Sequence, residues 1–162
     1  MKLGTSQARD FFDSVYDAAR EADRFSRAIA RMESREGAKA QSYSERVSMG
    51  GDRDVMEPTD RRIDYEERCR RRREEDYALI DRACEVIYGR QDQCSGGIGA
   101  ILGSAYADAL WWRYCAAAPW PEVAAGVGMS ERFCRDAVRV AMETIDAYGL
   151  DRVATGLGLA EG

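Results

Sequence analysis

Residues 113–141 read RYCAAAPWPEVAAGVGMSERFCRDAVRVA, and the spacing of proline, glycine and serine in this stretch predicts two helices joined by a tight turn. Pro119 can begin a short first helix, because proline is tolerated at the first helical positions. Gly128 tolerates the left-handed conformation that a tight turn needs, and Ser130 is a suitable N-cap for a second helix. That second helix is expected to run to about Tyr148. The stretch therefore predicts a helix-turn-helix.

The second expected helix has an apolar side and a charged side. At about 100° per residue, the apolar side carries Cys134, Val138, Ala141 and Ile145, flanked by Ala137 and Tyr148. The opposite side carries Arg132, Arg135, Asp136, Arg139 and Glu143. On any single amphipathic helix such charges are usually only solvated, but in a helix-turn-helix this face enters the DNA major groove. The candidate DNA-binding residues are Ser130, Glu131, Arg132, Arg135, Asp136 and Arg139.

Three short motifs carry a resemblance to a known class of regulators. They are Leu110-Trp111-Trp112-Arg113-Tyr114, Trp120-Pro121-Glu122-Val123-Ala124 and Gly128-Met129-Ser130. Together they resemble the fourth conserved region of bacterial sigma factors, and more closely the phage transcriptional regulators of the RinA and ArpU kind. The resemblance implies a phage or prophage regulator that binds double-stranded DNA, with late-gene activation at promoters alongside RNA polymerase.

The charge balance leaves a second function open. The net charge is −5, and residues 105–162 carry 5 basic and 8 acidic side chains. DNA-binding proteins usually show a basic footprint, because neutralising phosphates supplies much of the affinity. Affinity for DNA would have to come from the local arginine face, from a homodimer or from RNA polymerase. The alternative is a helical protein-binding adaptor or inhibitor that keeps the helix-turn-helix fold without binding DNA.

A heptad pattern predicts a long first helix within residues 1–36, with steps of four and three residues between apolar positions. These positions are Phe11, Val15, Ala18, Ala22, Phe25, Ile29 and Met32. Such a seam suits either an antiparallel hairpin within the chain or a dimerising coiled coil, and we favour the hairpin slightly. The best partner within the chain is the stretch 77–87, because Tyr77, Ile80, Cys84 and Ile87 continue the same spacing, with Ile63 at its far end.

The remaining segments are expected to connect these units. Residues 37–59, with a glycine pair, a proline and several serines, are interpreted as a flexible linker. Residues 60–97 are expected to form a charged long helix and a turn, and the mixed-sign run RCRRRREED at 68–76 favours a salt-bridged helix over a phosphate clamp. Residues 98–149 are expected to form the sigma-region-four-like domain. Residues 150–162 are expected to be a flexible tail, with at most a short turn at Leu150 to Val153.

The helical patterns predict an all-α protein, and the composition favours a cytoplasmic protein that is not an enzyme. The resemblance implies that the cytoplasm is that of a bacterial host cell. The chain has no histidine, the commonest general base and metal ligand, and no serine or cysteine lies in a nucleophile motif. Its five cysteines lack paired metal-binding spacing and are expected to be reduced thiols. No apolar run predicts a signal peptide or a membrane span. We expect no catalytic residue, no metal site and no cofactor.

Overall fold

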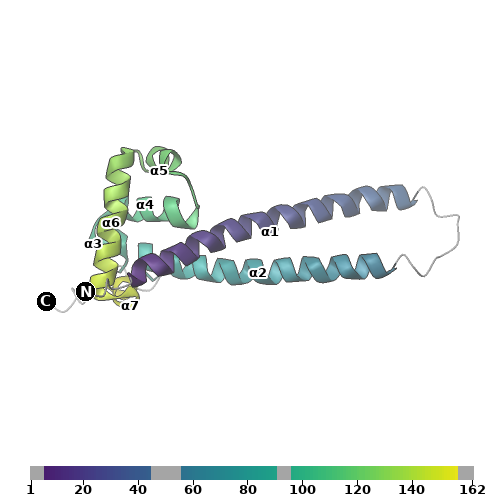
Figure 1. The fold of residues 1–162 in the computed structure, drawn as a ribbon, viewed down its shortest axis with the longest axis horizontal. Helices are drawn as coiled ribbons and strands as arrows, with labels where there is room; N and C mark the ends of the chain where they lie inside the picture. Colours follow the sequence, from purple (N-terminus) through teal and green to yellow (C-terminus); the bar gives the residue numbers. More distant parts are fainter. Residues whose placement is uncertain (1–5, 45–55, 91–95, 157–162) are drawn as a thin grey trace. The chain divides into compact units, whose positions relative to one another are not determined.

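The computed structural model describes residues 6–44, 56–90 and 96–156, and within these residues every regular element is a helix (Figure 1). The expected all-α class is therefore confirmed. Two helices are long, α1 (Gln7–Ser44) and α2 (Met56–Tyr88). The shorter elements are α3 (Ile98–Ile101), α4 (Ser104–Leu110), the π-helix η2 (Trp111–Cys115), α5 (Trp120–Val127), α6 (Glu131–Tyr148) and α7 (Leu150–Thr155).

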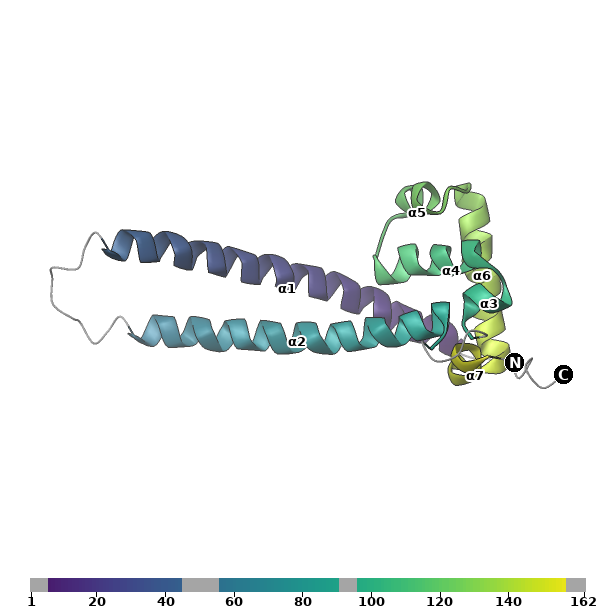
Figure 2. The same ribbon diagram turned by 180° about the vertical axis from the view of Figure 1, so that it is seen from behind.

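The chain divides into two compact units, and α1 and α2 contribute to both. Met1–Arg20 and Tyr77–Gly162 form the first unit, and Glu21–Asp76 forms the second. In the first unit the Arg82 guanidinium of α2 lies 5.7 Å from the centroid of the Phe11 ring of α1. In the second unit Arg72 of α2 forms an ion pair of 3.1 Å with Glu21 of α1. The long helices therefore pair within the chain (Figure 2), as the hairpin hypothesis expects.

The second unit has a small apolar cluster and many charged contacts. Phe25, Ile29 and Cys69 are buried together, with Met32 partly buried against them. Arg70 forms ion pairs with carboxylates of both helices, at 2.8 Å from Glu33 and 2.7 Å from Glu66. The charged run of α2 is thus salt-bridged, as expected from its mixed signs. Exposed ion pairs contribute little individually, so this unit depends on its short apolar cluster.

Two of the five residues expected in the seam of α2 are exposed, whereas Ile87 is fully buried and Ile80 and Cys84 are half-buried. Cys69 and Ala83 are buried, whereas Ile63 and Tyr77 are 42% and 45% exposed. The predicted seam placed the largest apolar residues of α2 against α1. However, α1 already supplies large side chains such as Phe25, and small residues opposite them let the helices pack closely. The choice of Ile63 and Tyr77 as seam residues was wrong.

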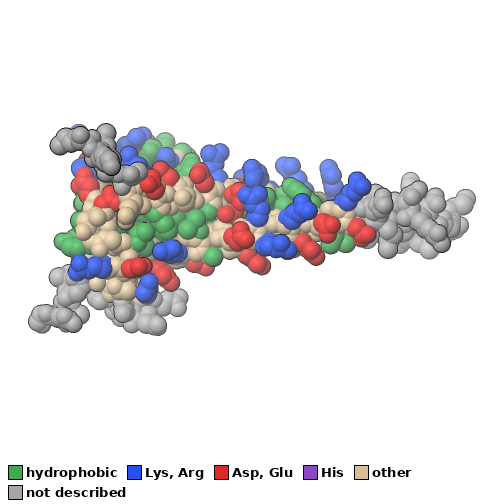
Figure 3. Space-filling view, turned by 60° about the horizontal axis from the view of Figure 1, so that its bottom comes forward, with side chains coloured by type: hydrophobic (Ala, Val, Ile, Leu, Met, Phe, Trp, Pro, Cys, Tyr) green, Lys and Arg blue, Asp and Glu red, His purple; other side chains and the backbone are tan. Residues whose placement is uncertain are grey.

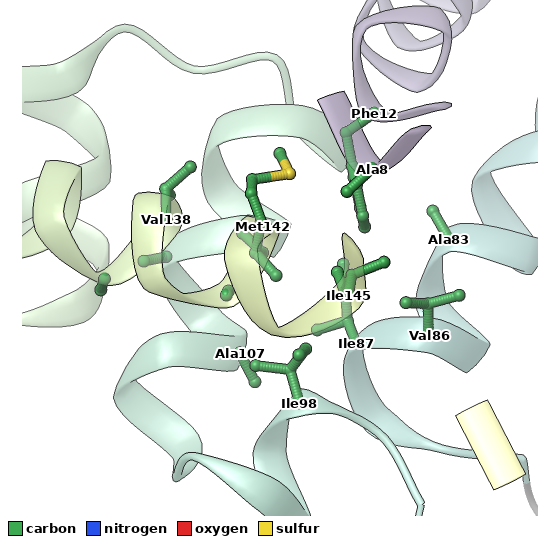
Figure 4. Packing of buried hydrophobic residues seen from close by; sticks show 14 of the residues in the cluster. Ala8, Phe12, Ala83, Val86, Ile87, Ile98, Ala107, Val138, Met142 and Ile145 are labelled. Atoms are coloured by element: carbon green, nitrogen blue, oxygen red, sulfur yellow. The ribbon is translucent and has the colours of Figure 1, made fainter. Parts of the chain in front are cut away.

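The core of the first unit draws on helices from both ends of the chain (Figure 4). Its fully buried side chains include Phe12, Ile87, Ile98, Leu110, Ile145 and Val153. The heptad pattern selected Phe11, which is only half-buried, and omitted Phe12. Phe12 is fully buried because a second surface covers α1 here, and its ring centroid lies 5.4 Å from that of Tyr114. A two-helix pattern cannot anticipate this additional neighbour.

The expected linker is shorter than its sequence indicated. Helix α1 continues past Gly37 to Ser44, and α2 begins at Met56, so both helices extend into the range 37–59. The residues after Gly37 are alanine, lysine, alanine and glutamine, which are good helix formers and outweigh one glycine. Residues 45–55 of the expected linker lie outside the described residues.

The expected tail contains a docked helix, α7, in which Val153 and Ala154 are buried. The backbone N–H of Gly97 donates to the Val153 carbonyl at 2.6 Å. A Cβ atom built on Gly96 would lie 2.1 Å from the Ala154 carbonyl oxygen, so glycine is required for this close approach. The prediction of a flexible tail is therefore wrong for residues 150–156, and residues 157–162 lie outside the described part.

Candidate nucleic-acid interface

The turn between α5 and α6 has the predicted local geometry. Gly128 ends α5 in the left-handed region, at φ 77° and ψ 27°. The Ser130 hydroxyl caps α6 by accepting a hydrogen bond of 3.1 Å from the Phe133 backbone N–H. Glycine removes the steric cost of the turn, and the cap satisfies one of the unpaired N–H groups at the helix start. The two helices and their turn are therefore fixed by local sequence.

The π-helix η2 precedes α5 and continues directly from α4. In η2 the Ala116 N–H bonds to the Trp111 carbonyl at 3.0 Å, five residues back. Ala117 then adopts φ 51°, the one left-handed non-glycine residue of the described chain. The wide turn and this strained residue end the helix and turn the chain toward α5. Propensity patterns do not distinguish an α-helix from a π-helix.

Helix α5 is held against the tryptophan pair of η2. A Cβ built on Gly126 would lie 2.3 Å from the Trp112 ring, so the absence of a side chain permits this packing. Val123 is fully buried, and Ala124 is partly buried against the same core. The first helix of the motif is thus packed closely against η2.

One side of α6 is buried, largely as its sequence predicted. Cys134, Ala137, Val138, Ala141 and Ile145 are all buried. Met142 is also buried and was missed, although it lies four residues after Val138; Figure 4 shows it in the same cluster as Phe12 and Ala8 of α1. Tyr148 was expected to flank this stripe, but it is 45% exposed. It is the last residue of α6, and there the core no longer covers the helix.

The opposite side of α6 brings the candidate residues together. Ser130, Glu131, Arg132, Arg135, Asp136 and Arg139 are all exposed. Arg139 forms an ion pair with Glu143 at 3.0 Å, one turn along the helix. Arg132 makes no ion pair with any residue in the described part of the chain. The arginines therefore differ in how freely they could reach a partner.

Trp120 holds two arginines, a role that its sequence position did not reveal. The guanidinium carbon of Arg135 lies 4.9 Å from the indole centroid, and that of Arg113 lies 4.7 Å from it. Arg113 also donates a hydrogen bond of 3.0 Å to the Ala118 carbonyl and lies 5.3 Å from the Tyr16 ring centroid. Trp120 is half-buried and packs against the core of the first unit. Arg113 precedes Trp120 by seven residues, and Arg135 follows it by fifteen. The three residues lie on η2, α5 and α6, so this arrangement depends on tertiary structure.

The electrostatic field around α6 is close to balanced. Its three arginines share the helix with Glu131, Asp136, Glu143 and Asp146. Asp146 is already engaged, because it accepts hydrogen bonds from the Ser6 hydroxyl at 2.5 Å and the Ala8 N–H at 2.8 Å. On the face drawn in Figure 3, basic and acidic side chains are interspersed. Any attraction to an anion must therefore act at short range, through individual arginines.

A metal site and a membrane span find no support in the described residues. Residues 6–44, 56–90 and 96–156 contain no group of three or more cysteine, aspartate or glutamate side chains that could hold a metal ion. No helix in that part of the chain is long and apolar enough to cross a membrane.

Comparisons of the chain with protein-family models, with curated proteins and with solved structures give no match. A function must therefore be argued from the chain's own residues.

Proposed function

We propose that this protein binds double-stranded DNA through the exposed face of α6 and regulates transcription. The observation that carries the proposal is the placement of Arg132 and Arg135 in the first two turns of a capped helix, opposite its buried stripe. In helix-turn-helix proteins these positions of the second helix lie nearest the base edges. The left-handed turn at Gly128 and the cap at Ser130 supply the corresponding local geometry.

The three arginines have different parts in the proposed interface. Arg132 is exposed and makes no ion pair within the described ranges, and a guanidinium can donate two parallel hydrogen bonds to a guanine edge. Arg135 rests on Trp120, which restricts its side chain before binding and lowers the entropic cost of a contact. Arg139 would first have to leave Glu143, so it contributes less. Arg132 is therefore the residue expected to matter most for sequence reading.

The biological setting follows from the sequence resemblance. It supports a phage or prophage regulator of late genes that acts in the bacterial cytoplasm with RNA polymerase. The weak local field suits such a role, because RNA polymerase or a second copy of the chain would supply binding energy that α6 lacks. A homodimer would double the number of arginine contacts without changing either helix.

Binding of the full chain to pooled genomic fragments of its source, followed by titration of the selected site at stated salt, tests the proposal. Arg132→Ala should weaken that site by about 1–3 kcal/mol, and binding to unrelated DNA should change little. Arg31→Ala is the matched control, because Arg31 is an exposed arginine of the second unit. Equal affinity of all three proteins for the selected site would remove Arg132 from the interface.

A protein-binding adaptor or inhibitor is the second candidate. The observation that favours it is the number of carboxylates on α6, including Glu131 and Asp136 beside the two foremost arginines. Such a mixed surface suits a partner with complementary charges of both signs. If the folded chain binds no DNA at low salt, and Asp136→Asn weakens a purified protein complex, this candidate replaces the first.

A further inference from the structure

Three arginines and two aromatic rings of the first unit alternate in a continuous row. The centroid of the Tyr16 ring lies 5.9 Å from the guanidinium carbon of Arg20 and 5.3 Å from that of Arg113. The Trp120 centroid lies 4.7 Å from the guanidinium carbon of Arg113 and 4.9 Å from that of Arg135. We call these five residues the arginine–aromatic row. It leads from the exposed face of α6 through α5 and η2 to α1.

The arginines of the row lack the carboxylate partners that several other arginines have. Arg139, for example, pairs with Glu143 at 3.0 Å. Within residues 6–44, 56–90 and 96–156, no row arginine forms an ion pair, and Arg113 makes a single hydrogen bond, to the Ala118 carbonyl. A guanidinium carries five N–H donors. The row therefore keeps positive charge, and donors that no described residue occupies.

The rings of the row are covered by guanidinium groups, and this decides what the row can bind. A nucleic-acid base stacks on an open aromatic face, but guanidiniums already lie over Tyr16 and Trp120. A guanidinium stacked on a ring still presents its N–H edge, which matches a phosphate with two parallel hydrogen bonds. Arg20 and Arg135 are exposed at the two ends of the row. The row thus suits phosphate groups rather than bases.

We propose that the arginine–aromatic row binds the sugar-phosphate backbone of the double-stranded DNA that α6 reads. This inference rests on the proposed DNA binding, and it adds Arg20 and Arg113, which lie outside the two motif helices, to the interface. Phosphate contacts fix the position of a protein on the duplex without reading its sequence. The stacking holds the guanidiniums in place before binding, so less side-chain freedom is lost when a phosphate binds.

Nearby carboxylates limit the range of this attraction. Asp17 and Glu122 are exposed and lie close in sequence to Tyr16 and Trp120. In the part of the chain that the structure describes, neither forms an ion pair with an arginine of the row. Mixed charges cancel one another beyond a Debye length. The row is therefore expected to act by direct contact with phosphates, not by attracting DNA from a distance.

A salt titration of the full chain tests the row, with a fluorescently labelled duplex of unrelated sequence and anisotropy as the readout. The logarithm of the affinity falls linearly with the logarithm of the salt concentration, with a slope of about −0.9 for each phosphate neutralised. Arg20→Gln should reduce the magnitude of this slope by about 0.9, and its combination with Arg113→Gln by about twice as much. Each variant should weaken the selected site and the unrelated duplex by the same factor, because both present the same phosphates.

Two further variants separate the charge of the row from its structural role. Arg152→Gln is the matched control, because Arg152 is an exposed arginine of the same unit that lies 6.0 Å from the ring centroid of Tyr148, the last residue of α6. It carries the same charge and a similar ring contact outside the row, so its loss should leave the slope unchanged. Arg113→Lys should also retain the slope, because the positive charge remains.

The outcomes distinguish the row from the α6 face. Unchanged slopes for Arg20→Gln and Arg113→Gln, with DNA still bound, would overturn the row and leave the α6 interface in place. An equal fall of the slope for Arg152→Gln would also overturn it, because overall charge would then be the cause. Failure of the wild-type chain to bind any duplex would instead remove the proposed function together with the row. Arg20 is exposed, so its variant tests the row even if Arg113→Gln does not fold.

Discussion

The Arg135 guanidinium lies over the Trp120 indole at 4.9 Å, so the first residue of α5 holds a side chain from the exposed face of α6. The same ring is shared with Arg113, which in turn contacts Tyr16 of α1. The geometry of the proposed DNA-binding face therefore depends on three other elements of the first unit. The contact between Trp120 and Arg135 can be measured in the absence of any ligand.

A double-mutant cycle between Trp120 and Arg135 should reveal the contact. The variants Trp120→Leu, Arg135→Ala and their combination are expected to show a coupling free energy of about 0.5–1 kcal/mol, the usual range for an exposed cation–π pair. Denaturant unfolding followed by circular dichroism measures it. A parallel cycle between Trp120 and Arg132 should show no coupling, and equal coupling in both cycles would contradict the assignment.

Two substitutions at left-handed residues should shift stability in opposite directions. Gly128→Ala should cost about 1 kcal/mol, because alanine is disfavoured at φ 77° although no atom lies within 4 Å of the added Cβ. Ala117→Gly should stabilise the protein by up to about 1 kcal/mol, because glycine relieves the strain at φ 51°. Chemical denaturation curves compare both with wild type. A stabilising Gly128→Ala would mean that the turn adopts another conformation.

Gly126→Ala should destabilise the first unit although alanine is the better helix former. The helix-propensity gain is about 1 kcal/mol, but the new methyl group would lie 2.3 Å from the Trp112 ring. We expect a net cost of about 1–3 kcal/mol from overpacking. The control is Ala125→Gly at the neighbouring exposed position of α5, which should cost only its propensity. Thermal melts would refute the close contact if Gly126→Ala proved more stable than wild type.

Asp76→Asn should stabilise the protein at neutral pH. Burial and then the neighbouring Glu21 raise the pKa of Asp76 from 3.8 to about 6, against the opposing effect of Arg72. The folded state therefore binds a proton at Asp76 more tightly than the unfolded chain does. Protonated Asp76 favours the folded state at low pH, and this stabilisation is lost as pH rises from about 4 through 6. Because Asp76 is only half-buried, we expect a gain of about 1 kcal/mol at pH 7.5.

The gain from Asp76→Asn should vanish below pH 4, where both proteins carry a neutral side chain at this position. Thermal melts across this pH range measure it. Glu74→Gln is the matched control, since Glu74 is an exposed carboxylate nearby in the sequence and its substitution should change stability by less than about 0.5 kcal/mol. A gain for Asp76→Asn that is independent of pH would contradict the role of its ionisation.

The parts of the fold that sequence predicted correctly are those set by local chemistry. Gly128, Ser130 and the buried stripe through Cys134 needed only turn geometry, capping and helical periodicity. The seam residues of α2, the burial of Phe12 and the docking of α7 depend on which element covers which. Periodicity describes one helix at a time, so it could identify an apolar face but not its neighbours.

The features of the candidate site also fall into those that local sequence predicts and those that depend on tertiary structure. Helical angle alone predicted that Arg132, Arg135 and Arg139 share an exposed face, and the structure confirms that exposure. The pairing of Arg139 with Glu143 was available from their spacing of four residues. The stacking of Arg135 on Trp120 was not, because it depends on the path of the turn between α5 and α6.

The bonds from Asp146 to Ser6 and Ala8 connect residues up to 140 positions apart in the sequence. They fix the start of α1 to the last turns of α6, and Phe12 completes the core there. The helix-turn-helix consequently depends on residues outside its own stretch of sequence. A fragment cut at residue 98 would expose Met142 and Ile145, whereas one that retains the paired ends of α1 and α2 would keep them covered. A transfer of this motif into another protein should therefore include the paired ends of α1 and α2.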